Sequence, residues 1–276
     1  MKSLKRSLIL FILMAGGVFA FSQYTKEKVN DGLQSQSDTK SISQGTISQT
    51  GNGNGMGVCT CNGYGSGNGN NNGNNNGKGN RGPGSEYLFS CITSLPVESL
   101  STSEISALKI MREEELMAHD VYEMFYSLYK IPVFNNISQA ETQHAEAVKT
   151  LLLKYSLPDP AINHVAGVFV NPDLQALYTS LVAQGKASLT AALTVGATIE
   201  DLDINDLHNH IADDVDNQDI LFVFGNLEKG SRNHLRSFNK LLTAKGITYT
   251  PQYISAEYFN QIISTPQETG SVECPN

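Results

Sequence analysis

Residues 137–155 read ISQAETQHAEAVKTLLLKY, and this stretch decides the fold class. Its apolar residues recur at steps of three and four, a spacing that keeps side chains on one face of a helix. Glu141 and His144 fall on that same face, between Ile137 and Val148. The pattern therefore predicts a buried helix that points a carboxylate and an imidazole into the core.

Three further stretches repeat this pattern, each with polar groups on an apolar face. The residues on these faces are Ile105, Leu108, Glu115, Tyr122, Phe125 and Tyr129 in the first, Leu189, Leu193, Gly196, Glu200, Asp203 and Leu207 in the second, and Ile220, Phe224, Leu227, Ser231, His234, Phe238 and Leu241 in the third. An ionised group is costly to bury unless it is paired or coordinates a metal. Four helices that each bury such a group indicate one shared site, and a metal explains it most simply.

The residue types suit a transition metal. Glu141 and His144 are three residues apart, so a carboxylate oxygen and an imidazole nitrogen can reach one ion. Glu115 and Glu200 come from separate helices and could bridge two ions, and His234 supplies a second imidazole. Mixed oxygen and nitrogen ligands favour iron or manganese, and zinc is possible.

The layout of two helices, a long connection and two more helices resembles the ferritin-like superfamily of diiron carboxylate proteins. The pattern of that superfamily is Glu, Glu-x-x-His, Glu, Glu-x-x-His over four helices. Residues 112–122, REEELMAHDVY, and residues 230–238, GSRNHLRSF, are similar to a branch known as a bacterial and archaeal domain of unknown function. The resemblance covers about residues 95–263. It implies an all-α, ferritin-like four-helix bundle with one long crossover that contains a short extra helix.

Carried over by position, the resemblance implies a set of metal ligands. They are Glu115, Glu141, His144, Glu200 and His234. The chain departs from the pattern at Ser231, where the superfamily has a glutamate. Glu228 lies six residues before His234, about 240° away around the helix, and is a poor substitute. Asp203, one turn after Glu200, could replace the carboxylate. The site would then hold one ion or two.

Each assignment has a simpler alternative. Glu141 could close a capping box with Ser138, and His144 could be a satisfied core histidine. Glu115 ends a run of three glutamates, and such runs usually mark a solvated face. His119 is a candidate for supporting a ligand. Tyr122 is most simply a core residue, although its hydroxyl could bond a ligand carboxylate.

The resemblance implies oxidation of ferrous iron by oxygen or peroxide, or peroxide reduction. The sequence contains no rubredoxin-like module of four cysteines, which disfavours a self-contained peroxidase of the rubrerythrin type. A different class of function stays open, namely a non-catalytic module that sequesters metal or docks another protein at the cell surface. A bundle held only by hydrogen-bonded polar networks is the least favoured interpretation.

The N-terminal residues are typical of an export signal. Lys2, Lys5 and Arg6 precede an apolar run over residues 8–21, so we expect a signal peptide over residues 1–22. An uncleaved anchor is the alternative, although the run is shorter than a spanning helix needs. Residues 23–85 are rich in Gly, Asn and Ser and predict a disordered linker. We therefore expect a secreted, periplasmic or cell-surface protein without stable membrane insertion after cleavage.

Composition limits the partners. The formal net charge of −8 makes the chain a poor ligand for nucleic acid, which requires clustered Lys and Arg. Metal ions are the expected partners, and a homo-oligomer is possible.

The four cysteines allow three pairings. Cys91 and Cys274 flank the helical region, and a bridge between them is the plain interpretation. Cys59 and Cys61 could bind a soft metal, pair with another chain or form a local bridge.

Residues 86–265 are expected to form one helical domain, followed by a tail over residues 266–276. Helices are predicted over about residues 101–130, 136–155, 172–184, 187–211, 217–245 and 255–263. Ser101 and Glu104 form a possible capping box at the first of these. Gly196 indicates a close contact between helices, and Gly246 suits a helix C-terminus.

Overall fold

The computed structural model describes residues 13–14, 17–18, 83–270 and 273–275. The chain divides into two compact units, residues 1–55 and 56–276. In the first unit, strands β1 (Leu13–Met14) and β2 (Gly17–Val18) pair antiparallel. These two-residue strands were not predicted, and they fall inside the expected export signal. The expected linker up to residue 82, with Cys59 and Cys61, lies outside the described residues.

The second unit is all-helical over its described residues, which confirms the all-α class. Its helices are α1 (Pro83–Ser94), α2 (Thr102–Tyr129), α3 (Pro132–Lys154), α4 (Pro172–Gly185), α5 (Leu189–Asp213), α6 (Gln218–Ala244) and α7 (Ala256–Ser264). None of the described helices is both long and apolar enough to cross a membrane.

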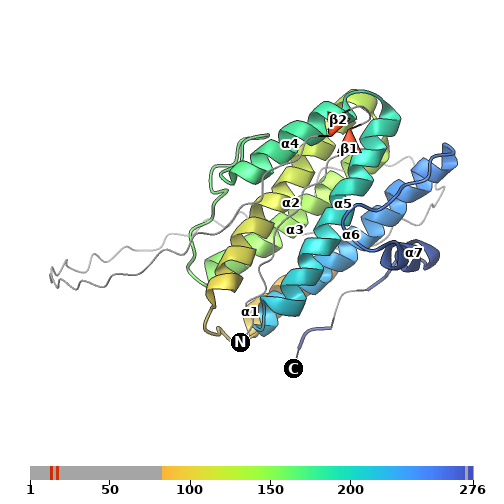
Figure 1. The fold of residues 1–276 in the computed structure, drawn as a ribbon. Coiled ribbons are helices and arrows are strands. Elements are labelled where there is room, and N and C mark those ends of the chain that lie inside the picture. The colour runs from red at the N-terminus through yellow and green to blue at the C-terminus, as the bar shows by residue number, and fades with distance from the viewer. Residues whose placement is uncertain (1–12, 15–16, 19–82, 271–272, 276) are drawn as a thin grey trace, which may run out of the picture. The chain divides into compact units, whose positions relative to one another are not determined.

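Four long helices surround the centre of this unit. Helix α2 packs on α3 and on α5, while α6 packs on α5 and on α3. The connection from α3 to α5 carries α4, which packs on α2 and α5. Figure 1 shows the four long helices side by side, with α1 at one end and α4 beside the opposite end. Polar groups at the middle of each long helix can therefore meet.

The predicted start of α2 is confirmed. The Ser101 hydroxyl accepts a hydrogen bond from the Glu104 amide at 3.1 Å, and the Glu104 carboxylate accepts one from the Ser101 amide at 2.7 Å. This capping box satisfies two amides that the first helical turn leaves free.

The predicted start of α3 near residue 136 was wrong. The helix begins at Pro132, preceded by Ile131, which makes no side-chain cap. Proline suits the first helical position, because its fixed φ matches the helix and its missing N–H is not needed there. Reading Pro132 only as a helix breaker placed the start about one turn too late.

Gly196 brings two helices into close contact, as predicted. A Cβ atom at Gly196 on α5 would lie 2.5 Å from ring atoms of Phe238 on α6. The Phe238 ring therefore occupies the space that a side chain at Gly196 would fill. This contact sits one turn from Glu200 and fixes the spacing of α5 and α6 beside the polar groups.

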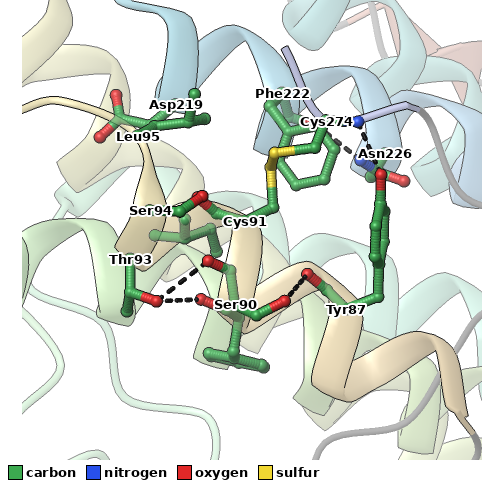
Figure 2. The surroundings of a disulfide bond; sticks show 12 residues. Tyr87, Ser90, Cys91, Thr93, Ser94, Leu95, Asp219, Phe222, Asn226 and Cys274 are labelled. Carbon is green, nitrogen blue, oxygen red and sulfur yellow. Dashed lines mark hydrogen bonds between the residues drawn. A yellow bond between two sulfur atoms is a disulfide. The ribbon is translucent and has the colours of Figure 1, made fainter. Parts of the chain in front are cut away.

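Helix α1 was not predicted, and a disulfide fastens it. Cys91 on α1 is bonded to Cys274 in the C-terminal tail, which confirms the plain interpretation of that pair. Figure 2 shows this bond beside Phe222, with the Cys274 amide donating to the Tyr87 hydroxyl at 2.8 Å. The tail is also held on α6, where the Arg232 guanidinium donates two hydrogen bonds to the Glu268 carboxylate.

Candidate metal centre

The five predicted ligand residues converge in the interior of the four long helices. Glu115 comes from α2, Glu141 and His144 from α3, Glu200 from α5 and His234 from α6. None of the five is more than 8 % exposed. The structure thus brings the five predicted ligand residues together.

One group consists of Glu115, Glu141 and His144, whose ligand atoms all lie within 4.8 Å of one another. The His144 Nδ1 atom lies 2.7 Å from Glu141 Oε2 and 3.1 Å from Glu115 Oε2. Two carboxylates and one imidazole from neighbouring helices therefore face a common point.

A second group consists of Glu141, Glu200 and His234, again within 4.8 Å. The His234 Nδ1 atom lies 2.9 Å from Glu141 Oε1 and 3.4 Å from Glu200 Oε2. The two imidazole rings stack with their centroids 5.7 Å apart. Glu141 belongs to both groups and turns one oxygen toward each histidine. The sequence suggests that Glu115 and Glu200 could bridge two ions; in the structure, the residue that both groups share is Glu141.

Several atoms of the two groups that could bind a metal lack hydrogen bonds. Glu115 Oε1, Glu141 Oε1 and His234 Nδ1 are buried and have no hydrogen-bond partner, although His234 Nδ1 and Glu141 Oε1 are near each other. A buried polar atom without a partner costs free energy. Cations bound by the two groups would satisfy these atoms, so the residues present fit a metal site.

The pKa values of the candidate ligands differ strongly from those of the same side chains in water. Burial raises the pKa of Glu115 to about 8, with the Glu141 charge adding to the effect and His144 opposing it. Burial and the Glu141 charge raise the pKa of Glu200 to about 7. Burial also acts to raise the pKa of Glu141, but the His234 and His144 imidazoles outweigh it and hold that pKa well below its usual range.

For His234, burial and the neighbouring charges shift the pKa in opposite directions. Burial alone lowers the pKa of an imidazole, yet the Glu141 and Glu200 carboxylates raise the pKa of His234 well above its usual value. Without a metal, a proton on His234 therefore supplies part of the positive charge that the surrounding carboxylates require.

Tyr122 supports Glu200. It is fully buried, and its hydroxyl donates a hydrogen bond of 2.5 Å to Glu200 Oε1, with the Gly196 carbonyl 3.3 Å away. Burial and the Glu200 charge raise its pKa well above the usual value, so the hydroxyl stays protonated. Tyr122 is thus a core residue that also fixes the orientation of a candidate ligand.

Ser231 contributes no carboxylate to the candidate site. Its hydroxyl donates a short hydrogen bond to Asp203 Oδ2. Asp203 lies outside both groups of convergent ligand atoms. Glu228 accepts a hydrogen bond from the Tyr258 hydroxyl at 3.1 Å and lies 3.2 Å from Arg232, so it is engaged elsewhere, as its helical angle predicted.

The alternative interpretation of Glu141 as a capping residue was wrong. Ser138 lies inside α3, and its hydroxyl donates to Glu123 at 2.6 Å. His119 Nδ1 lies 2.9 Å from the Ser138 carbonyl and 3.1 Å from the Thr142 hydroxyl, and these contacts join α2 to α3.

The alternative of a solvated face for Glu113, Glu114 and Glu115 was also wrong, because all three are buried. Glu113 accepts a hydrogen bond from the Val170 amide at 2.5 Å, an interaction with the crossover that residue spacing does not reveal.

Similarity to known proteins places the chain in a family. Residues 104–266, more than half of the chain, match the family described as "Uncharacterized protein domain (DUF2202)". The chain belongs to this family.

Two comparisons extend the similarity beyond that segment. The chain is 51 % identical over 179 residues to uncharacterized protein MJ0754 of Methanocaldococcus jannaschii, covering 65 % of this chain and 96 % of that one. A crystal structure of hypothetical protein MJ0754 from Methanococcus jannaschii superposes with a TM-score of 0.62 at 50 % identity, covering 63 % of this chain and 99 % of that one. The helical unit is therefore a fold shared with an archaeal protein.

Proposed function

We propose that this chain is an exported, ferritin-like metal-binding protein that holds two divalent ions in its core. Iron is the first candidate, and manganese or zinc would also suit the ligands. The observation that carries the proposal is the pair of ligand groups sharing Glu141, with buried donor atoms that have no hydrogen-bond partner. A pair of adjacent cations is the chemical species that such an arrangement fits.

The division of ligands follows the geometry. Glu115 and His144 would hold one ion, Glu200 and His234 the other, and Glu141 would lie between them. Each group offers three protein atoms, fewer than the four to six that these metals take, which leaves positions for a small molecule. Two redox-active ions would supply the electrons for reducing oxygen or peroxide, and this oxidase-like iron chemistry is the activity we propose.

The chain contributes orientation and a dry interior. Tyr122 holds Glu200 through its 2.5 Å hydrogen bond. The ring of Phe238 lies 5.4 Å from the Tyr122 ring, centroid to centroid, and both side chains are fully buried. Fixed ligands in a water-poor site need little rearrangement during a reaction.

A second function, metal sequestration without turnover, is supported by one observation. Ser231 stands at a position where the ferritin-like pattern has a glutamate, and its hydroxyl is used by Asp203. A centre with one carboxylate fewer carries less negative charge and would hold its second ion more weakly. Oxygen consumption separates the two functions, because a sequestering protein binds ferrous iron without consuming oxygen.

Export is part of the proposal. The disulfide between Cys91 and Cys274 supports it, since disulfides persist mainly in oxidising compartments outside the cytoplasm. The basic and apolar character of residues 1–21 supports it independently.

The test is metal analysis of the full chain purified without chelators, followed by oxygen consumption on adding ferrous iron. We expect two ions per chain and oxygen uptake. Glu141→Ala should remove both ions, while Glu146→Ala, a half-buried carboxylate on the same helix that pairs with Lys149, should keep them. Full metal content in Glu141→Ala would refute the proposed site.

A further inference from the structure

A stripe of polar side chains on α6 holds the C-terminal tail. Lys229, Arg232, Asn233 and Arg236 recur at steps of three and four residues, which places them on one face of the helix. Each donates hydrogen bonds to oxygens between residues 262 and 270. Three of the four side chains are cationic, in a chain whose formal net charge is −8. The stripe therefore carries the charge that attracts an acidic partner.

Glu268 is the centre of this contact, and two arginines bind its carboxylate. Arg232 donates from Nε to Oε1 at 2.8 Å and from Nη2 to Oε2 at 2.6 Å, and Arg236 Nη1 donates to Oε1 at 3.0 Å. Arg232 also lies 3.2 Å from Glu228 on its own helix. A fork-shaped pairing of arginine with a carboxylate is both strong and geometrically specific. The stripe thus favours a carboxylate over a neutral side chain.

Asn233 binds the backbone of the same residue. Its Oδ1 accepts a hydrogen bond from the Glu268 amide at 2.9 Å, and its Nδ2 donates to the Glu268 carbonyl at 2.9 Å. Asn233 is only 6 % exposed, so it makes these bonds beneath the tail. An amide side chain that pairs with both main-chain groups of one residue fixes the register of a peptide. Together with the arginines, Asn233 recognises one position of a peptide and requires a glutamate there.

The tail is held without the apolar burial that fixes most segments. No side chain of residues 264–270 is buried, and the last buried one before them is Ile262 on α7. A segment with few buried apolar contacts can detach while the rest of the protein stays folded. The bond between Cys91 and Cys274 keeps the tail near the stripe, and a short tether of this kind gives a roughly millimolar effective concentration. The tail is therefore a tethered occupant of the stripe.

We propose that Arg232, Asn233 and Arg236 form a binding site for a peptide segment that carries a glutamate, and that the tail of this chain occupies the site. When the tail leaves, the partner is a glutamate-bearing segment of another chain, held by the hydrogen bonds that hold Glu268. None of the three residues belongs to the groups that share Glu141. Peptide binding here does not depend on a metal in the core, so it goes beyond the proposed function.

Fluorescence anisotropy with a labelled peptide STPQETG, the sequence of residues 264–270, tests the site. The receiving protein is the full chain with Cys91→Ser, Cys274→Ser and Glu268→Ala, whose tail is neither anchored nor able to fill the carboxylate position. We expect it to bind the peptide at least about tenfold more tightly than oxidised wild type, where the tethered tail competes. A peptide with glutamine in place of the glutamate should bind about tenfold more weakly, because it loses the charge-assisted hydrogen bonds.

Matched variants of the receiving protein locate the binding. Adding Arg232→Ala and Arg236→Ala should abolish peptide binding. Adding Lys240→Ala and Lys245→Ala, which removes two exposed charges farther along the chain, should leave it unchanged. The site is overturned if wild type and the receiving protein bind the peptide equally, if the receiving protein does not bind it at all, or if the glutamate and glutamine peptides bind alike. Glu268→Ala alone, with the disulfide kept, gives the same comparison if the receiving protein does not fold.

The oligomeric state identifies the source of the peptide segment. If Cys91→Ser with Cys274→Ser forms a dimer in a reducing buffer, and Glu268→Ala disrupts this dimer, the partner is the tail of a second copy. If that variant stays a monomer while the receiving protein binds the peptide, the partner is a segment of another protein. Metal analysis decides the proposed function separately. A chain that binds its ions but no peptide overturns this site alone, and a chain that binds peptide but no metal leaves it standing.

Discussion

Ser231 on α6 donates its hydroxyl hydrogen bond to Asp203 on α5 in the buried layer between these helices. Ser231 is fully buried, and a carboxylate from the neighbouring helix lies against its hydroxyl. This contact holds the Asp203 carboxylate where its charge acts against those of Glu115, Glu114 and Glu200.

Replacing Ser231 tests this relationship. Ser231→Ala removes the only hydrogen bond that the structure shows for the buried Asp203 carboxylate, so we expect the free energy of unfolding of the metal-free protein to fall by about 1–3 kcal/mol. Ser237→Ala is the control, since its half-buried hydroxyl donates to the carbonyl one turn earlier, at Asn233, and accepts only a long hydrogen bond of 3.5 Å from Gln267. Urea denaturation measures both. Equal loss in the two variants would contradict a special role for Ser231.

The sharing of Glu141 predicts an asymmetric effect of removing ligands. Glu115→Ala should remove one ion and leave the group of Glu141, Glu200 and His234, whereas Glu200→Ala should do the reverse. Glu141→Ala should remove both. Metal analysis of the three variants, checked for native helix content by circular dichroism, gives the result. Loss of both ions in all three would instead indicate one cooperative site.

The pKa values predict how stability depends on pH. The folded-state pKa of Glu115 is about 8 and that of Glu200 about 7, both above the value near 4.5 expected for an unfolded glutamate. A raised carboxyl pKa stabilises the fold fully below the unfolded pKa, and this stabilisation is lost as pH rises through the folded pKa. The metal-free protein should therefore lose stability between about pH 5 and pH 8.

Stabilisation by bound metal should instead increase as the pH rises, because binding requires ionised carboxylates and releases their protons. Metal affinity should rise by about tenfold per pH unit for each proton released below pH 7. Thermal unfolding from pH 5 to pH 8 with and without metal measures both trends. Glu115→Gln should flatten the metal-free curve, and an unchanged slope in that variant would show that Glu115 does not titrate in this range.

The residues that meet in the centre were predictable because helical spacing is a local property. Glu115, Glu141, His144, Glu200 and His234 each interrupt an apolar face, and four such faces can be buried only against one another. The same logic gave the contact at Gly196. Periodicity thus predicts which residues are candidate ligands, but it does not predict the distances between them.

Other features depend on contacts between distant segments and were not predictable. From the sequence alone, Glu113 and Glu114 look like surface charges. In the structure, the amides of residues 170 and 171 donate hydrogen bonds to Glu113. The shared position of Glu141 depends on how α3 sits between the two histidines, which no spacing encodes. Helix α1 packs on α3 and α6, segments distant in the chain, in addition to its disulfide with the tail.

The contact between Gly196 and Phe238 predicts opposite effects for two glycine substitutions. Gly196→Ala would place a methyl group 2.5 Å from the Phe238 ring, which must then move, and overpacking of this kind costs about 1–3 kcal/mol. Because Tyr122 lies near the carbonyl of Gly196 and bonds Glu200, the shift should also weaken metal binding at Glu200. Gly225→Ala on α6 is the control, since its added Cβ meets nothing within 4 Å. An alanine there should stabilise the helix by about 0.5–1 kcal/mol. Thermal unfolding and metal content of the two variants decide the matter: if Gly196→Ala is as stable and as metal-rich as Gly225→Ala, the close packing of α5 on α6 does not hold the site together.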